Sequence, residues 1–334
     1  MSATSLPNPS PPRRDQREVT GINPLRARAR VRDMLARELL TPADLVAPVL
    51  VQPARRPAHE HAHLPGSVRV NRLAEHARQL NDAGVRAIKL FCYVENKSAD
   101  ASTALRTDNL LITGIDIVRS TLPDMVITTE VCGCAWTDHG ECVLLDDHDR
   151  TDRDATYTLM SQMAQLHAQA GADIIGPAAV LEGSVSAIRA ALDNAGFPDV
   201  GITPSVILDS ALFATYKQAM NTDPRRGNRR GFQLDACHAG QAVDLAHRWL
   251  DEGADSLLVQ PAMMAVDVLT RLRSETRVPI TAFSVSGEDE LLQDSPDALY
   301  LEYACALKRA GADLVMTYGA LRLATALHAA GGPA

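Results

Sequence analysis

The stretch "AGADIIGP" at residues 170–177 recurs along the chain as "EGADSLLVQP" (252–261) and "AGADLVMTY" (310–318), with a looser copy, "AGVRAIKLF" (83–91). Each copy has three parts: the end of a helix, a glycine suited to the left-handed conformation that ends helices, and an apolar run typical of a buried strand. A repeated strand-and-helix unit predicts an α/β fold with a parallel sheet.

Four further apolar runs, rich in β-branched residues, bring the number of predicted strands to eight: 46–52, 125–132, 200–207 and 278–286. A helical pattern follows each strand, at 70–84, 109–122, 155–171, 184–196, 239–253, 265–275, 298–311 and 320–332. Eight such units predict a (β/α)8 TIM barrel. A doubly wound sheet is the alternative, but the chain has no GxGxxG turn to support it.

The domain prediction is one barrel over residues 41–334, preceded by a flexible tail and N-terminal arm at 1–40. The tail is rich in Pro, Ser and Arg, which favours disorder until a partner binds. A net charge of -8 and 4% aromatic residues argue against nucleic acid as a partner. No apolar run reaches the roughly 18 residues of a membrane span, and no secretory signal is visible. We therefore expect a cytoplasmic protein.

Three of the six cysteines lie in "EVCGCAWTDHGEC" (130–142), at the end of a predicted strand, where the active sites of barrels are found. Cys132 and Cys134 would point to the same side of an extended segment, and a short loop returns Cys142. Three thiolates predict a zinc site with an open fourth position, which His139 or Asp138 could fill. Free buried thiols and a redox-sensing loop are the alternatives. The other cysteines are predicted to pack in the core: Cys92, Cys237 and Cys305.

At this point the chain resembles the porphobilinogen synthase (5-aminolevulinate dehydratase) family. The resemblance covers roughly residues 24–325 and includes "VCGCAWTDHGEC" (131–142), "RRGFQLD" (229–235), "VSGE" (285–288) and "KRAGADLVMTY" (308–318). It implies a (β/α)8 barrel whose N-terminal arm embraces a neighbour, usually in octamers. It also implies the joining of two 5-aminolevulinate molecules into a pyrrole, with two Schiff-base lysines and a zinc ion on three cysteines.

Several functional residues of the family have counterparts here. The resemblance makes Cys132, Cys134 and Cys142 the zinc ligands. In the family, two polar clusters hold the carboxylates of the two substrates. One cluster would be Lys217, Arg229 and Gln233, with Lys217 where the family usually has Arg. The other would be Ser286 and Tyr318.

The departures concern the covalent chemistry. Gln260 and Ile207 stand where the family has its two Schiff-base lysines, and neither side chain can form an imine. Gln260 could instead hydrogen-bond a substrate carbonyl or only satisfy neighbouring polar groups. Further departures are Ala179 and Glu130, each at a usual Asp, and Phe283 at a usual Tyr.

The chain has only four lysines, at 89, 97, 217 and 308. Lys89 lies inside a predicted strand and could point into the barrel, and Lys97 lies in the next loop and could reach its mouth. Either could serve as a relocated Schiff-base lysine, whereas Lys308 lies mid-helix, away from the mouth. We assign no catalytic residue from the sequence.

The resulting prediction is a zinc-dependent lyase or condensing enzyme of the porphobilinogen synthase type, acting without the usual Schiff bases. Its substrate would be 5-aminolevulinate or a related small amino or keto acid, in a specialised biosynthetic pathway. A homo-oligomer built through the arm is expected. The alternative is a non-catalytic paralogue that assembles with, or regulates, an active member of the family.

Overall fold

The computed structural model describes residues 30–31, 40–55, 64–222 and 229–329. The described residues from Leu40 onward belong to one compact unit. Apart from Arg30, Val31 and Leu40, the predicted tail and arm lie outside the described residues. In the part of the chain that the structure describes, no helix is both long enough and apolar enough to cross a membrane.

The core of the unit is a parallel sheet with the strand order β6-β5-β4-β3-β1-β10-β9-β8-β7. Because β6 and β7 are consecutive pieces of one segment, the two ends of this order meet and the sheet closes into a barrel. The predicted (β/α)8 class is confirmed, and all eight predicted strands are present. Their bounds are β1 Leu45–Gln52, β3 Ala87–Cys92, β4 Val126–Val131, β5 Ile174–Pro177, β6 Gly201–Ile202 with β7 Ser205–Ile207, β8 Leu257–Gln260, β9 Ile280–Ser284 and β10 Leu314–Thr317.

The break between β6 and β7 falls at Thr203 and Pro204. Proline has no N–H to give to a strand ladder, so regular pairing is interrupted there. Hydrogen bonds still continue on both sides of the break. The Thr203 N–H donates to the Ile175 carbonyl at 2.8 Å, and the Pro204 carbonyl accepts from the Leu258 N–H at 3.0 Å. The segment therefore bridges β5 and β8 and closes the barrel.

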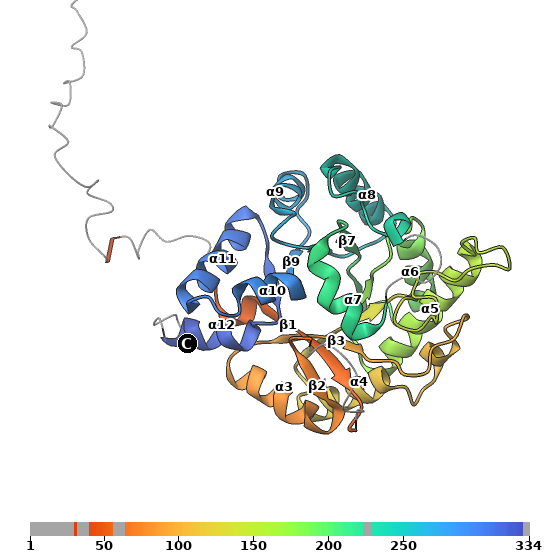
Figure 1. Cartoon of the computed structure of the whole chain (residues 1–334), viewed down its shortest axis with the longest axis horizontal. Helices are drawn as coiled ribbons and strands as arrows, with labels where there is room; N and C mark the ends of the chain where they lie inside the picture. Colours follow the sequence, from red (N-terminus) through yellow and green to blue (C-terminus); the bar gives the residue numbers. More distant parts are fainter. Residues whose placement is uncertain (1–29, 32–39, 56–63, 223–228, 330–334) are drawn as a thin grey trace, which may run out of the picture. The chain divides into compact units, whose positions relative to one another are not determined.

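Eight helices surround the strands, as the sequence predicts, and Figure 1 shows them as an outer ring. They are α3 Leu73–Asp82, α4 Leu110–Thr121, α5 Arg153–Ala170, α6 Ser184–Asn194, α8 Ala239–Asp251, α9 Val266–Glu275, α11 Asp297–Ala310 and α12 Ala320–Ala329. The described residues also form five short 3-10 helices, the first of which precedes β1: η1 Pro42–Asp44, η2 Val70–Arg72, η3 Ser102–Leu105, η4 Ala211–Phe213 and η5 Arg229–Phe232.

Besides most of these 3-10 helices, one strand and two helices were not predicted. Strand β2 (Ser67–Arg69) pairs with the last residues of β1. Helices α7 (Ala214–Met220) and α10 (Ser286–Leu292) pack against each other and lie inside the ring of helices in Figure 1. Both follow the carboxyl ends of strands, so they cover the face of the barrel on which the site is built.

The repeated sequence unit has a structural role at each copy. Gly171 and Gly311 end α5 and α11 with φ angles of 104° and 119°, which confirms the predicted left-handed caps. The repeated aspartate carboxylates accept backbone N–H groups of the adjacent strand at 2.7–2.8 Å: Asp173 from Ile127, Asp255 from Ile202 and Asp313 from Ile280. The repeat thus fixes where each strand starts relative to its neighbour.

Candidate active site

A cavity that is partly open to solvent lies at the carboxyl ends of the strands. It brings together all three predicted metal ligands and five of the six predicted substrate-binding residues: Cys132, Cys134, Cys142, Lys217, Gln233, Gln260, Ser286 and Tyr318. The sixth, Arg229, begins η5, but its side chain lies outside the described residues.

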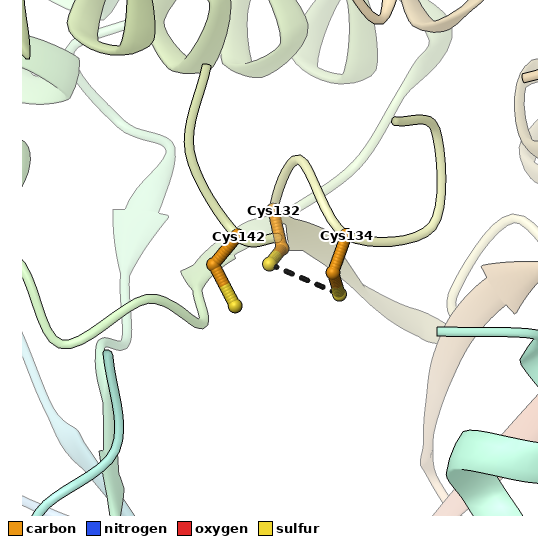
Figure 2. Close-up of side chains that lie close together, drawn as sticks. All are labelled: Cys132, Cys134 and Cys142. Carbon is orange, nitrogen blue, oxygen red and sulfur yellow. Dashed lines mark hydrogen bonds between the residues drawn. The ribbon is translucent and has the colours of Figure 1, made fainter. Parts of the chain in front are cut away.

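The three thiols of Cys132, Cys134 and Cys142 form one cluster, and Figure 2 shows them pointing to the same side of their loop. Their sulfur atoms all lie within 4.8 Å of one another, and those of Cys132 and Cys134 are 3.3 Å apart. Two sulfurs bound tetrahedrally at Zn–S distances of about 2.3 Å would be roughly 3.8 Å apart. The donor set and its spacing therefore fit a three-thiolate metal site.

The thiols are buried, at 3–5% exposure. Hydrogen bonding to Cys134 and Cys142, together with burial, raises the pKa of Cys132 well above its ordinary value. A divalent cation favours the thiolate and so opposes these effects, which is why metal binding at such a site releases protons.

A close backbone contact brings Cys142 to the other two cysteines. The Gly133 N–H donates to the Cys142 carbonyl at 3.0 Å. A Cβ atom at residue 133 would lie 2.8 Å from that carbonyl oxygen, so a larger residue would push the two segments apart. The Thr137 hydroxyl closes the intervening loop by donating to the Glu141 carbonyl at 2.9 Å. Glycine at 133 thus shapes the cluster.

Neither candidate for a fourth ligand belongs to the cluster, which among the described residues consists of the three cysteines. The His139 Nδ1 accepts the Glu141 N–H at 3.2 Å, and Asp138 is exposed. Since all three cysteines line the cavity, a metal bound to them would present its remaining position to that space. An open position of this kind suits a catalytic site better than a structural one.

Beside the cysteines, the cavity holds a buried ion pair. The Lys89 Nζ on β3 lies 3.5 Å from Oε2 of Glu130 on β4, with the two side chains 2% and 16% exposed. The Tyr216 hydroxyl on α7 donates to Oε1 of Glu130 at 3.3 Å. Burial raises the pKa of Glu130, while the charge of Lys89 opposes the rise. Sequence reasoning missed Tyr216, because α7 is too short to give a clear periodic pattern.

The cavity is also lined by Ile207 and Gln260, the residues at the positions where the sequence resemblance predicts the family's lysines. Ile207 and Gln260 are register partners at the ends of β7 and β8, each 6% exposed. Ser286 begins α10, and its buried hydroxyl has no hydrogen-bond partner among the described residues. Tyr318 follows β10 and packs against the Phe283 ring at 6.0 Å. The buried Ser286 hydroxyl is therefore a ready hydrogen-bonding group for a ligand in this cavity.

Lys97 lies beside the cavity but does not line it. Its Nζ donates to the carbonyls of Met220 and Asn221 at 2.9 and 2.8 Å, at the end of α7, and it is not among the residues that line the cavity. Lys308 donates to Asp44 and to the Asp313 carbonyl, away from the cavity as expected. Of the four lysines, Lys89 and Lys217 line the cavity.

The predictions for the isolated cysteines had mixed outcomes. Cys92 is buried, and burial raises its pKa to about 12, as suits a core residue. Cys305 is half-buried. The prediction for Cys237 is wrong: it is exposed, because it lies in the turn before α8, where its N–H donates to the Asp235 carboxylate.

Comparison with known proteins points in one direction. The model of the delta-aminolevulinic acid dehydratase family matches residues 21–326. The enzyme of that name from Synechocystis sp. is 33% identical over 303 residues, covering 87% of this chain and 93% of that protein. That from Halalkalibacterium halodurans is 32% identical over 314 residues, covering 91% and 95%. A Toxoplasma gondii structure of the enzyme with its product porphobilinogen matches with a TM-score of 0.83 and 26% identity, over 91% of each chain.

Proposed function

Because the chain belongs to the delta-aminolevulinic acid dehydratase family, we propose that it is a zinc-dependent lyase or condensing enzyme that acts on 5-aminolevulinate or a related small amino or keto acid. In this proposal it works without the family's two usual lysines, because the sequence resemblance puts Ile207 and Gln260 at their positions. The relatives named above are called delta-aminolevulinic acid dehydratases, and we propose the substrate in that name for this chain as well.

One observation carries the proposal: the cysteine cluster opens into the same cavity as the groups suited to hold a small acid. A metal on Cys132, Cys134 and Cys142 would polarise a carbonyl or lower the pKa of a bound amine or water. Lys217 would supply a positive charge for a carboxylate. The Ser286 hydroxyl, together with Tyr318, would bind a second polar group.

Apolar side chains complete the lining of the cavity. Phe91, Phe213, Phe232 and Phe283 all line it. A site walled by aromatic rings strengthens the few polar contacts inside it and disfavours hydrolysis of reactive intermediates. The arrangement suits condensation or dehydration of small acids.

Three further parts of the proposal follow from family membership: zinc as the resident metal, a homo-oligomer built through the N-terminal arm, and work in the cytoplasm. The thiolate donor set supports the choice of zinc, because soft sulfur ligands select it over magnesium. A specialised biosynthetic pathway, rather than general porphyrin supply, would account for the changes at the lysine positions.

The test is formation of porphobilinogen from 5-aminolevulinate, and then turnover of a panel of related amino and keto acids, by the purified full-length protein. We expect one zinc per chain and turnover that a chelator removes and added zinc restores. Cys132→Ala should lose both the metal and at least 100-fold in turnover, on the order of what loss of metal-borne charge stabilisation costs.

The matched control is Cys237→Ala, which removes an exposed thiol far from the cluster in sequence and should change neither quantity. A zinc-loaded protein that turns over no acid of the panel, but copurifies with an active family member, would instead support the non-catalytic paralogue.

A further inference from the structure

Lys89 reaches the middle of the barrel from a strand far from Ile207 and Gln260. Its Nζ is 3.5 Å from Glu130 on the neighbouring strand β4 and 5.8 Å from the ring centroid of Phe283 on β9. It is also 3.9 Å from the point where a Cβ at Gly176 on β5 would lie. Since β9 and β5 lie three and two places from β3 around the barrel, in opposite directions, the amine is close to the barrel axis.

The surroundings of this amine are those of a reactive group rather than a surface charge. The side chain is 2% exposed, yet it lines the cavity. Phe91, Phe283 and Ile207 form apolar walls of the same space. The chain buries this lysine with one carboxylate partner, at the cost of desolvating both charges, and a fully apolar pair would avoid that cost.

We propose that Lys89 is the nucleophile of this site and forms an imine with the ketone of a small keto acid; this rests on the proposed function for its substrate class. The Nζ attacks the carbonyl carbon, the C=O bond breaks and a C=N bond forms. The carbonyl oxygen leaves with the two hydrogens of the neutral amine as one water. The Glu130 carboxylate, whose Oε2 lies 3.5 Å from Nζ, orients the amine inside the barrel.

The position of Lys89 also relates the imine to the metal site. Glu130, its ion-pair partner, lies two residues before Cys132, at the end of the same strand. A keto acid held on Lys89 therefore lies beside the cysteine cluster, where a second acid could be held by the metal. Ile207 on β7 and Gln260 on β8 lie several strands away from β3 around the barrel. The Lys89 amine would therefore approach the reacting carbon from a different side of the barrel than a lysine at either of those positions.

The experiment is reductive trapping on the full-length, zinc-loaded protein with levulinate, a keto acid that lacks the amine of 5-aminolevulinate. After treatment with sodium borohydride, peptide mapping by mass spectrometry should find one adduct, on the peptide containing Lys89. The added mass should be that of levulinic acid less one oxygen atom. Lys308→Met, which removes a lysine away from the cavity, should leave the adduct unchanged.

Lys89→Met should abolish the adduct. The double variant Lys89→Met/Glu130→Gln should abolish it too. It serves as a second test because it leaves no unpaired charge inside the barrel. Adduct on Lys89 supports the proposal even if no product forms from 5-aminolevulinate. Absence of an adduct on Lys89 at saturating levulinate overturns it, even if the protein turns over 5-aminolevulinate. Trapping on Lys217 instead would also overturn it. The test is thereby separate from that of the proposed function.

Discussion

At the scale of single residues, burial rather than residue type sets the chemistry of the interior. His167 on α5 is fully buried, and its Nδ1 lies 3.1 Å from the Thr129 hydroxyl on β4. Desolvation lowers the pKa of His167 to about 4, so the native protein holds a neutral imidazole. The unfolded chain, with a pKa near 6.5, takes up a proton more readily.

This difference predicts a pH-dependent loss of stability. Between pH 6.5 and pH 4 the unfolded state binds more protons than the native state, so the free energy of unfolding falls as pH is lowered. For His167 the fall is about 3 kcal/mol from pH 7 to pH 4, from a shift of roughly 2.5 units. His167→Gln keeps a polar partner for Thr129 but cannot titrate, so its stability should fall less over this range.

Urea unfolding of both proteins at pH 7, 5.5 and 4 measures the effect. The difference between wild type and variant isolates His167, because contributions from groups such as Glu288, whose burial raises its pKa to about 6, are common to both. Parallel pH profiles for the two proteins would show that His167 is protonated without penalty in the native state.

Residue-scale detail also limits what the sequence can reveal. The apolar pattern predicted a strand that contains Lys89. Because alternate residues of a strand face the same side of the sheet, the Lys89 side chain could point into the barrel. The pattern does not say how far a four-carbon side chain extends, nor that Glu130 would meet it. The cysteine cluster was predictable as a set of ligands, yet the dependence of its shape on Gly133 appears only from the contact with Cys142.

At the scale of elements, long periodic segments were predictable and short ones were not. All eight strands and the eight helices of the ring came from hydrophobic pattern and the repeated glycine. Helices α7 and α10 each have seven residues, less than the two to three turns needed for a clear pattern. These two helices carry Tyr216, Lys217 and Ser286 to the cavity, so the missed elements are part of the site.

Helix α7 is held in place by a lysine from another part of the chain, which leads to a prediction. Lys97 donates to the carbonyls of Met220 and Asn221, which helix formation leaves without partners. Lys97→Met should lower the free energy of unfolding by about 1 kcal/mol. It should also speed hydrogen exchange in α7 and weaken substrate binding, because α7 carries Lys217 and Tyr216.

Lys308→Met is the matched control, since Lys308 also donates to a backbone carbonyl, that of Asp313, but away from the cavity. Lys308→Met should lower the free energy of unfolding by a similar amount. It should change neither the rate of hydrogen exchange in α7 nor the KM for the substrate. Equal KM values for Lys97→Met and wild type would show that α7 holds its position without this contact.

At the scale of the whole molecule, we expect the barrel to fold without the N-terminal segment. The buried hydrophobic core of the described residues begins at Leu40, and the sheet closes without any residue before Leu45. The sequence resemblance assigns residues 1–40 to a tail and an arm that embraces a neighbouring copy. Stability of the fold and size of the assembly should therefore depend on different parts of the chain.

Deletion of residues 1–39 tests this division. Because the core and the cysteine cluster lie after the deleted part, the shortened protein should fold and bind one zinc per chain. Its Tm should lie within a few degrees of that of the full chain, which is on the order of the shift that about 1 kcal/mol produces. Its mass by light scattering should drop to that of a smaller assembly. An unchanged mass would show that surfaces of the barrel, rather than the arm, hold the copies together, whereas loss of folding would show that the segment contributes to the core.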